Sequence, residues 1–172
     1  QLFSEFVPSH VVYNGIDVSR LPFGERAAEE YLWAGRISPE KGLHTAIAVV
    51  CGRMKKRLVV CGRAYDQQYF DLRIAHLLKD PAVEYAGICS SSELYRRLCR
   101  ARALVFPVCG DEAFGMILIE ALGCGAPVGA FPRGAVPEIV LCGQNGRLAA
   151  DEDALAAALE QSSSALEQIA SM

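Results

Sequence analysis

The chain has 172 residues and lacks a surplus of positive charge, because its 17 Lys and Arg residues stand against 20 Asp and Glu. The formal net charge is −3 and the isoelectric point is about 5.6. This balance excludes a broad basic surface for nucleic acid or for anionic lipid. Any anion that binds here must be held by a few placed groups. No apolar run approaches the roughly 18 residues that a membrane span needs, so we expect no transmembrane segment.

Closely paired cysteines are also lacking, although the sequence contains seven cysteines. A zinc ribbon or a redox dithiol needs close pairs such as C-x-x-C. Here the cysteines are spread along the chain: Cys51, Cys61, Cys89, Cys99, Cys109, Cys124 and Cys142. Several lie inside apolar stretches, where a buried thiol behaves as a small hydrophobic side chain. We therefore expect reduced thiols, no disulfide framework and no metal site.

The first residues, Gln1–Pro8, lack the basic start and the apolar core of a signal peptide. Together with reduced thiols, this favours a cytoplasmic protein, whose full-length form could still bind peripherally to a membrane. Because the sequence does not begin with Met, we expect it to be an excised fragment of a longer chain; the alternative is a signal removed before Gln1.

A hydrophobic content of 52% and a mean hydropathy of +0.20 exclude disorder and predict one compact domain. Short strand-like runs alternate with amphipathic helical stretches, which is typical of βαβ units and a parallel sheet. The predicted strands are His10–Tyr13, Tyr31–Ala34, Arg57–Cys61, Val83–Tyr85, Ala103–Pro107, Pro127–Ala130 and Gly146–Leu148. The predicted fold class is α/β: a Rossmann-like, three-layer domain with a mostly parallel sheet.

The helices predicted between these strands are Gly42–Arg53, Gln67–Leu78, Ser91–Arg100, Gly115–Gly123, Val136–Val140 and Asp151–Glu160. Ser90–Glu93 forms a capping box, and Pro81 ends the helix before it. Ser162–Ser164 predicts a break before a short last helix, Ala165–Ser171. Ligands of an open parallel sheet bind outside the carboxyl ends of its strands, so the loops that follow strands are the candidate site.

The first such loop, Gly35–Gly42 (GRISPEKG), follows a strand and leads into a helix. It carries Arg36 and Lys41 where a helix N-terminus already favours anions. Arginine can bind phosphate oxygens through two nitrogens, and lysine adds a point charge. Two cations in one such loop predict a phosphate site, although either alone is common on a surface turn. Glu40 would either orient one of these cations or be solvated.

Two glutamates flank the start of the helix predicted over Gly115–Gly123. Glu112 lies in the loop before it, whereas Glu120 lies among its apolar residues, where a carboxylate is costly unless it is paired. Because a helix rises about 1.5 Å per residue, a phosphate at the amides near Gly115 would lie between the two carboxylates. Glu120 could then accept hydrogen bonds from a ribose diol, and Glu112 could meet a sugar hydroxyl. Glu112 would also be favourable near a helix N-terminus without any ligand.

The third loop, Phe131–Glu138, follows the strand Pro127–Ala130 and leads into a short helix. Arg133 and Gly134 place a cation and an uncovered backbone at the same rim of the sheet. Glu138 is interpreted as a structural partner rather than a reactive group. No G-x-G-x-x-G motif follows the early strands, which argues against a dinucleotide-binding oxidoreductase.

Four strings of the sequence, taken together, resemble a known family. They are NGID (Asn14–Asp17), GRISPEKG (Gly35–Gly42), EAFGMILIEALGCGAPV (Glu112–Val128) and RGAVPEIV (Arg133–Val140). In this order they resemble the C-terminal domain of family 4, or group 1, glycosyltransferases of the GT-B fold, over nearly the whole chain. The resemblance implies an enzyme of the hexosyltransferase type. It would pass a sugar from a nucleoside diphosphate to an acceptor hydroxyl with retention of anomeric configuration.

The resemblance also implies a role for each matched residue. Arg36 and Lys41 match the cations that hold the donor diphosphate. Glu112 and Glu120 match a pair of glutamates of which the first, taken as the catalytic residue, contacts the donor sugar and the second contacts the ribose hydroxyls. Ile88 falls in a loop that meets the base through backbone atoms. The segment whose backbone amides line the diphosphate and the sugar is matched by Phe114, Gly115, Met116 and Ile117.

Enzymes of this kind need no metal or other cofactor, because cations and helix dipoles would neutralise the leaving diphosphate. Their N-terminal domain supplies acceptor contacts and a histidine, and we expect it to be missing here, since His10, His44 and His76 do not replace that histidine. Residues 1–172 are predicted to form a single nucleotide-sugar-binding domain that is inactive alone. Residues 1–9 and 162–172 would connect it to the missing domain. Ala113, where relatives often have Pro or Gly, is a small departure.

Two alternatives share the donor but not the reaction. A sugar-nucleotide 2-epimerase of similar fold would need no acceptor, and the lack of a second set of acidic and histidine groups argues mildly against it. A non-catalytic module would bind the nucleotide sugar only to regulate a partner, and such a sensor would not need Glu112.

Overall fold

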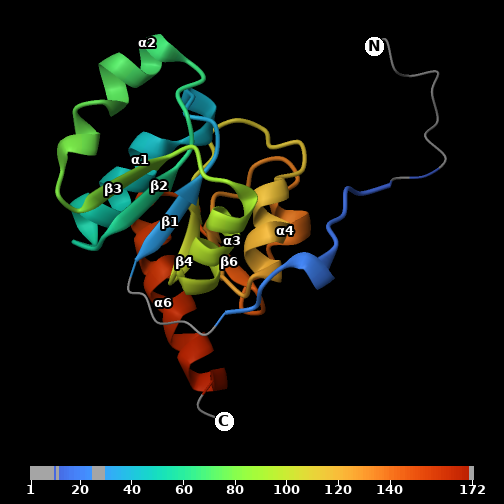
Figure 1. The fold of residues 1–172 in the computed structure, drawn as a ribbon. Helices are drawn as coiled ribbons and strands as arrows, with labels where there is room; N and C mark the ends of the chain where they lie inside the picture. Colours follow the sequence, from blue (N-terminus) through green and yellow to red (C-terminus); the bar gives the residue numbers. More distant parts are fainter. Residues whose placement is uncertain (1–9, 11, 25–29, 171–172) are drawn as a thin grey trace, which may run out of the picture.

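The computed structural model describes His10, residues 12–24 and residues 30–170, with side chains described as far as Gln161. Its centre is a parallel sheet of six strands in the order β3-β2-β1-β4-β5-β6 (Figure 1). The strands are β1 Tyr31–Ala34, β2 Leu58–Cys61, β3 Val83–Gly87, β4 Ala103–Phe106, β5 Val128–Ala130 and β6 Gly146–Leu148. This is the strand order of a doubly wound Rossmann-like sheet, so the predicted α/β fold class is confirmed.

Alternation along the strands divides the core into two halves. In β1, Tyr31 and Trp33 pack into one half. Leu32 and Ala34 pack into the other half, on the opposite face of the sheet. Leu58 lies beside Tyr31 in parallel register and joins the same half. Every position of β1, β2 and β4 is buried, which explains why these strands are apolar on both faces.

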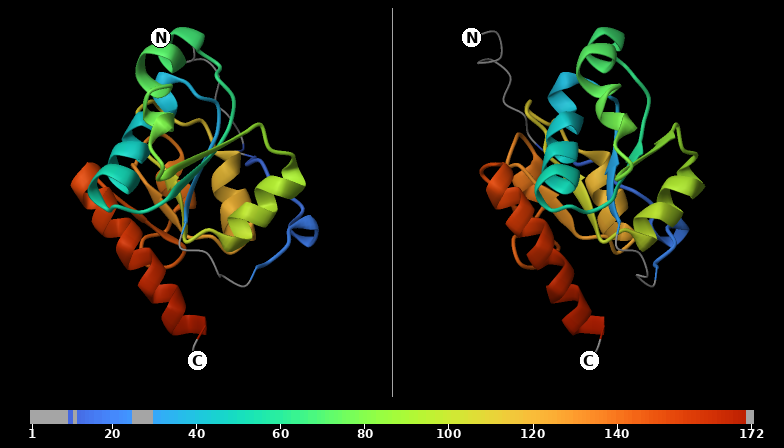
Figure 2. Two further views of the ribbon diagram at one scale, coloured as in Figure 1. Left: turned by 60° about the vertical axis from the view of Figure 1, so that its left-hand side comes forward. Right: turned by 90° about the vertical axis from the view of Figure 1, so that its left-hand side faces the viewer.

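Helices cover both faces of the sheet (Figures 1 and 2). The first face carries α1 (Leu43–Ile47), its continuation η3 (Ala48–Arg53), and α6 (Glu152–Ala170). The second face carries α3 (Ser91–Arg100), α4 (Met116–Gly123) and α5 (Val136–Ile139). The remaining short elements are η1 Val18–Arg20, η2 Pro39–Lys41, α2 Gln67–Tyr69, η4 Phe70–Ile74 and η5 Leu77–Lys79. The helix predicted over Gln67–Leu78 is therefore a succession of shorter turns.

Two further predictions were wrong. Ser162–Ser164 does not break the last helix, because α6 runs without interruption to Ala170. A serine costs a helix only about 0.5 kcal/mol relative to alanine, and the neighbouring Ala, Leu, Glu and Gln residues favour helix. His10–Tyr13 is not a strand either: its described residues have no strand pairing, and Val12 is 90% exposed. An apolar, β-branched stretch becomes a strand only beside a partner. Val11 and residues 1–9 lie outside the described residues.

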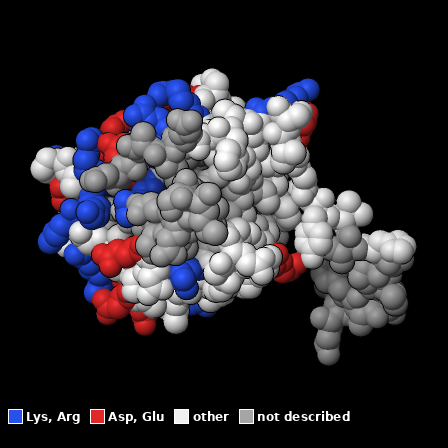
Figure 3. Space-filling model, turned by 90° about the horizontal axis from the view of Figure 1, so that it is seen from below, with Lys and Arg blue, Asp and Glu red and all other residues white. Residues whose placement is uncertain are grey.

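The described surface carries charges of both signs. Seen from below, Lys and Arg side chains lie among Asp and Glu side chains along one side of the molecule, and much of the rest of this face is uncharged (Figure 3). Elsewhere on the described surface, opposite charges form ion pairs, for example Arg57 with Glu30 (3.2 Å) and Arg53 with Glu152 (2.7 Å). Within residues 12–24 and 30–170, no helix has both the length and the apolarity needed to cross a membrane.

Strand order reverses between β1 and β4, because β2 and β3 lie on one side of this pair and β5 and β6 on the other. At such a switch point the connections leaving the two central strands go to opposite faces, and a crevice forms beyond their carboxyl ends. The loops concerned are 35–42, after β1, and 107–115, after β4. Two of the charged loops identified from the sequence therefore meet at this crevice.

A glycine allows these two loops to touch. Gly42 has a left-handed backbone (φ +67°), and a Cβ at this position would lie 2.0 Å from the carbonyl oxygen of Pro107. Both the backbone angle and the contact disfavour any side chain. The turn that carries Lys41 therefore depends on Gly42.

We predict that Gly42→Ala destabilises the chain by about 2–3 kcal/mol, because the substitution adds left-handed strain to a steric clash. Gly52→Ala is the matched control: Gly52 lies in η3 with no neighbour within 4 Å of an added Cβ. Replacing this helical glycine by alanine should raise the free energy of unfolding by about 0.5–1 kcal/mol. Urea unfolding of both variants measures the difference, and an equal effect of the two substitutions would contradict the prediction.

Candidate functional site

The loops after β1 and β4 are joined through their backbones. The amide of Cys109 donates to the carbonyl of Glu40 at 2.8 Å, and this bond joins the two loops. In addition, the indole Nε1 of Trp33 in β1 donates to the carbonyl of Lys41 at 3.2 Å, which fixes the first loop. The Glu40 carboxylate accepts from Ser38 Oγ at 2.6 Å, and this hydrogen bond lowers the pKa of Glu40. Glu40 therefore braces its own turn, and the nearby charges of Arg36 and Lys41 also contribute to its lowered pKa.

The side chain of Arg36 extends from the first loop and lies over a tyrosine ring. Its guanidinium carbon is 4.7 Å from the ring centroid of Tyr65, in the loop after β2. The interaction of a cation with an aromatic face is favourable by about 0.5–1 kcal/mol at an exposed site. Both residues are exposed, so this contact orients the cation without burying it.

Lys41 and Glu112 form the central ion pair of the site. Nζ of Lys41 lies 2.5 Å from Oε2 of Glu112, although the residues are 71 positions apart in the sequence. The side chains are only 19% and 11% exposed, so either charge would be costly without the other. The residues predicted to contact the diphosphate and the donor sugar therefore neutralise each other.

The loop after β5 supports Glu112 from a third side. The amide of Ala135 donates to the carbonyl of Glu112 at 2.8 Å. Gly134 has φ +56°, and a Cβ there would lie 2.2 Å from the same carbonyl oxygen, so only glycine permits this approach. Arg133 is exposed beside it. The third charged loop thus converges on the same glutamate.

The start of α4 adds backbone donors to this arrangement. Gly115 caps the helix in a left-handed conformation (φ +85°), and a Cβ there would lie 3.4 Å from Cγ of Glu112. The first amides of a helix lack acceptors within the helix, and the helix dipole favours an anion near them. Met116 and Ile117 are the first two residues of α4.

Glu120 lies within α4 and has a partner from α3. The hydroxyl of Tyr95 donates to Oε1 of Glu120 at 3.1 Å. The partly buried carboxylate is thereby paired, as its apolar surroundings require.

An open cleft of about 450 Å³ lies beyond the carboxyl ends of β1 and β2. Its lining residues are Ala34, Gly35, Arg36, Cys61, Gly62, Arg63, Ile88, Cys89, Leu94, Met116, Ile117 and Glu120. We call it the switch-point cleft. Five of the nine predicted site residues line it: Arg36, Ile88, Met116, Ile117 and Glu120. The other four lie on the adjoining loops: Lys41, Glu112, Phe114 and Gly115. The volume is within the range of about 300–1,000 Å³ that is usual for small-molecule sites.

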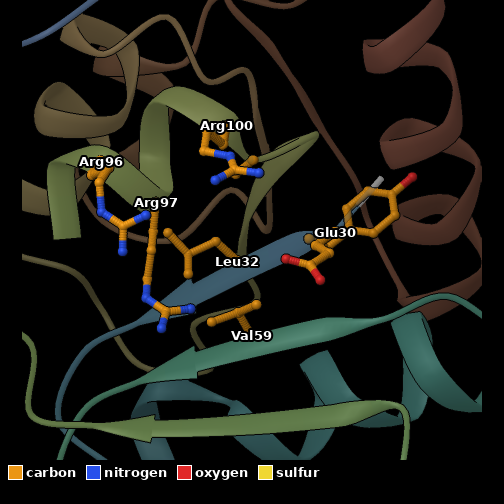
Figure 4. Close-up of a pocket in the computed structure, with 8 residues that line it drawn as sticks. Glu30, Leu32, Val59, Arg96, Arg97 and Arg100 are labelled. Atoms are coloured by element: carbon orange, nitrogen blue, oxygen red, sulfur yellow. The ribbon is translucent and has the colours of Figure 1, made fainter. Parts of the chain in front are cut away.

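A second hollow, of about 170 Å³, lies beside α3 and contains none of the predicted site residues. Arg96, Arg97 and Arg100 come from α3, and Glu30 lies across the hollow at the start of β1 (Figure 4). Arg97 also forms an ion pair with Glu84 at 2.8 Å. This hollow is part of a charge network between α3 and the sheet, and it is smaller than the switch-point cleft.

Two thiols line the switch-point cleft. The Sγ atoms of Cys61 and Cys89 are 3.2 Å apart, and all seven cysteines are free. Burial, with a smaller contribution from Cys89, raises the pKa of the Cys61 thiol to about 12, so at neutral pH it is protonated and unreactive. Among the residues that the structure describes, no group of three or more His, Cys, Asp or Glu side chains could hold a metal ion.

Two tyrosines that contact the site were not predicted from the sequence. Tyr65 and Tyr95 lie outside the charged motifs. For Tyr95 the available signal was only that a half-buried tyrosine hydroxyl needs a partner, and the exposed Tyr65 gave no signal. Glu138, interpreted as a structural partner, accepts a hydrogen bond from the hydroxyl of Tyr13 at 2.5 Å. The ring of Tyr13 lies 6.2 Å from that of Phe114, which places Tyr13 beside the loop before α4.

Comparison with known proteins identifies the family. The family described as "Glycosyl transferases group 1" matches residues 28–164. The chain is 34% identical over 154 residues to a glycogen synthase of Mycobacterium tuberculosis (strain H37Rv), covering 83% of this chain and 36% of that protein. It is 32% identical over 136 residues to the GDP-mannose:cellobiosyl-diphosphopolyprenol alpha-mannosyltransferase of Xanthomonas oryzae pv. oryzae. This match covers 72% of this chain and 35% of that protein. The chain thus spans about a third of these relatives' length.

Solved structures share the fold. Anabaena Alr3699/HepE, in complex with UDP and glucose, matches with a TM-score of 0.75 and 22% identity, covering 88% of this chain and 46% of that chain. Its complex with UDP-glucose matches with a TM-score of 0.74 and 21% identity, covering 92% of this chain and 52% of that chain. The family match spans most of this chain, and its sheet has the topology expected from the resemblance. The chain therefore belongs to the group 1 glycosyltransferases and has the Rossmann-like architecture of one half of a GT-B fold.

Proposed function

We propose that this chain is the donor-binding half of a retaining glycosyltransferase that moves a hexose from a nucleoside diphosphate sugar to an acceptor hydroxyl. The observation that carries the proposal is the switch-point cleft, which has Arg36 and Glu120 in its lining and adjoins the Lys41–Glu112 pair. A nucleoside diphosphate sugar presents matching groups in order: a ribose diol, two phosphates and a sugar. Relatives named as a glycogen synthase and a GDP-mannose-dependent transferase, and a structural neighbour solved with UDP-glucose, support this class of donor.

The diphosphate would bind between the two cations and the start of α4. Arg36 is held over Tyr65 while its guanidinium stays exposed, so it can reach phosphate oxygens through two nitrogens. Lys41 adds a point charge from the same loop. The amides of Met116 and Ile117 would supply neutral donors, aided by the dipole of α4.

The nucleoside would occupy the cleft itself. Glu120 would accept hydrogen bonds from the ribose hydroxyls, because an ionised carboxylate offers several acceptor positions. Ile88, after β3, is 74% exposed and lines the cleft, so its backbone would be accessible to the base. In this arrangement the base would lie near β3 and the phosphates near β1 and α4.

The charges of Lys41 and Glu112 suit the bond that must break. As the sugar leaves the diphosphate, positive charge develops on the sugar and negative charge develops on the phosphate. Glu112, the proposed catalytic residue, would stabilise the first, and Lys41 would stabilise the second. With Arg36 and the helix dipole also acting on the phosphate, the leaving group would need no metal ion.

The acceptor would be held by a part of the protein outside this chain. The chain spans about a third of the curated relatives it matches, and each of its assigned residues would contact the donor. Orientation of a second reactant can contribute roughly 7–11 kcal/mol to lowering a barrier. A half-site that holds only the donor would therefore bind the nucleotide sugar without transferring the sugar at a useful rate.

We predict that Arg36→Ala and Lys41→Ala each weaken binding of a nucleoside diphosphate by roughly 10- to 150-fold, from a loss of about 1.5–3 kcal/mol per charge-assisted contact. Binding of the nucleoside without phosphates should change little. A thermal-shift screen of UDP, GDP and ADP selects the base, and calorimetry then compares diphosphate with nucleoside. Lys56→Ala, which removes an exposed lysine before β2, is the control. Equal losses for both ligands would mean that these cations do not contact the phosphates.

We predict that EDTA leaves the affinity for the nucleoside diphosphate unchanged, because Arg36, Lys41 and the helix dipole carry its charge. Calorimetry in EDTA and in Mg²⁺ or Mn²⁺ measures this. A requirement for either ion would transfer the diphosphate charge to a metal and remove the roles given to the two cations.

We predict that the 172-residue chain binds its donor but transfers sugar to no acceptor, and that transfer appears when the remaining domain is supplied. The assay measures release of the nucleoside diphosphate and sugar products across a panel of sugar acceptors, with and without that domain. Robust transfer by the chain alone would show a complete active site and end the half-site interpretation. Donor binding with no transfer by the reassembled protein would favour the non-catalytic module.

A further inference from the structure

The contact between Tyr95 and Glu120 joins two helices across the second face of the sheet. Tyr95 lies in the middle of α3, and its hydroxyl is 3.1 Å from Oε1 of a carboxylate on α4. The ring of Tyr95 is half-buried against the core half that contains Leu98 and Leu118. Its position is therefore fixed by packing, and the hydroxyl meets Glu120 from a rigid base.

The hydroxyl acts as a donor across the physiological pH range. Burial, followed by the contact with Glu120, raises the pKa of Tyr95 above its usual value near 10. The phenol therefore keeps its proton at neutral pH, and the bond to the carboxylate is not lost by titration of Tyr95.

This bond restricts the carboxylate without using up its acceptor capacity. A glutamate side chain has three rotatable bonds, and ordering it costs entropy when a ligand binds. Tyr95 engages one lone pair of Oε1, whereas a carboxylate has about four acceptor positions. Glu120 also lines the switch-point cleft, so the remaining positions are available to a ligand there.

We propose that Tyr95 is a positioning residue that pre-orients Glu120 toward the ribose diol and so strengthens the selection of ribonucleotides over 2′-deoxyribonucleotides. The inference rests on the proposed function, since it assigns Glu120 to the ribose of a nucleoside diphosphate. Tyr95 itself does not contact the donor. Its effect is the restriction that it places on the carboxylate before binding.

The test compares UDP with 2′-deoxy-UDP by calorimetry in the wild-type chain and in Tyr95→Phe. Phenylalanine keeps the packed ring and removes only the hydroxyl. We expect the preference for UDP to fall about three- to tenfold, through weaker binding of UDP, while binding of 2′-deoxy-UDP changes less. Tyr69→Phe is the matched control, because it removes a half-buried hydroxyl that contacts His44 at 2.7 Å on the first face of the sheet. It should leave the preference unchanged.

A second comparison separates positioning from general structural support. In a Glu120→Gln background, Tyr95→Phe should have little further effect on the preference, because both changes act through one carboxylate. Loss of thermal stability with an unchanged preference would show that Tyr95 only supports the fold, and would overturn the inference.

The outcomes also separate this inference from the proposed function. If the wild-type chain prefers UDP and Tyr95→Phe keeps that preference, the inference fails and the donor site stands. If the wild-type chain binds UDP and 2′-deoxy-UDP equally, the role of Glu120 fails and the inference fails with it. If it binds none of UDP, GDP and ADP, the proposed function fails as well.

Discussion

The close approach of Gly42 to the carbonyl of Pro107 decides where the charged side chains of this domain can meet. Parallel strands deliver their loops to one edge of a sheet, but loops after β1 and β4 lead to different faces and would otherwise separate. The contact brings the turn of Lys41 against the strand end that leads to Glu112. Once the two backbones are joined, three features lie close together around Glu112: its ion pair with Lys41, the contact with Gly134, and the start of α4.

Four charged side chains around the cleft contact a neighbour from another part of the chain. Lys41 holds Glu112, Tyr95 holds Glu120, and Tyr65 lies beneath Arg36. Lys41, Glu112 and Glu120 are partly buried, and burial makes an unpaired charge costly, so their partners allow these charges to remain at the cleft. The partners contribute to stability and also restrict the conformations of the charged side chains before any ligand binds.

Local patterns in the sequence sufficed to predict the parallel sheet, the loops that carry Arg36 and Glu112, and the helix that carries Glu120, because strand alternation, charged turns and helix starts are encoded by neighbouring residues. Contacts between distant residues could not be derived in the same way. Tyr95 looks like an ordinary apolar position of an amphipathic helix until α3 is packed on α4. His10–Tyr13 failed for the same reason, since strand-like residues have no strand without a partner.

The pairing of Lys41 with Glu112 also bears on how fast an anion can reach the cleft. Two opposite charges 2.5 Å apart act at a distance as a dipole, so the long-range field is set by the cleft's other charges. Among the cleft's lining residues, Arg36 and Arg63 are basic and Glu120 is acidic, which leaves a weak positive excess. Salt at physiological strength screens such a field beyond about 8 Å. A diphosphate would therefore arrive at a rate that depends only slightly on ionic strength, and its charge would be recognised mainly after contact.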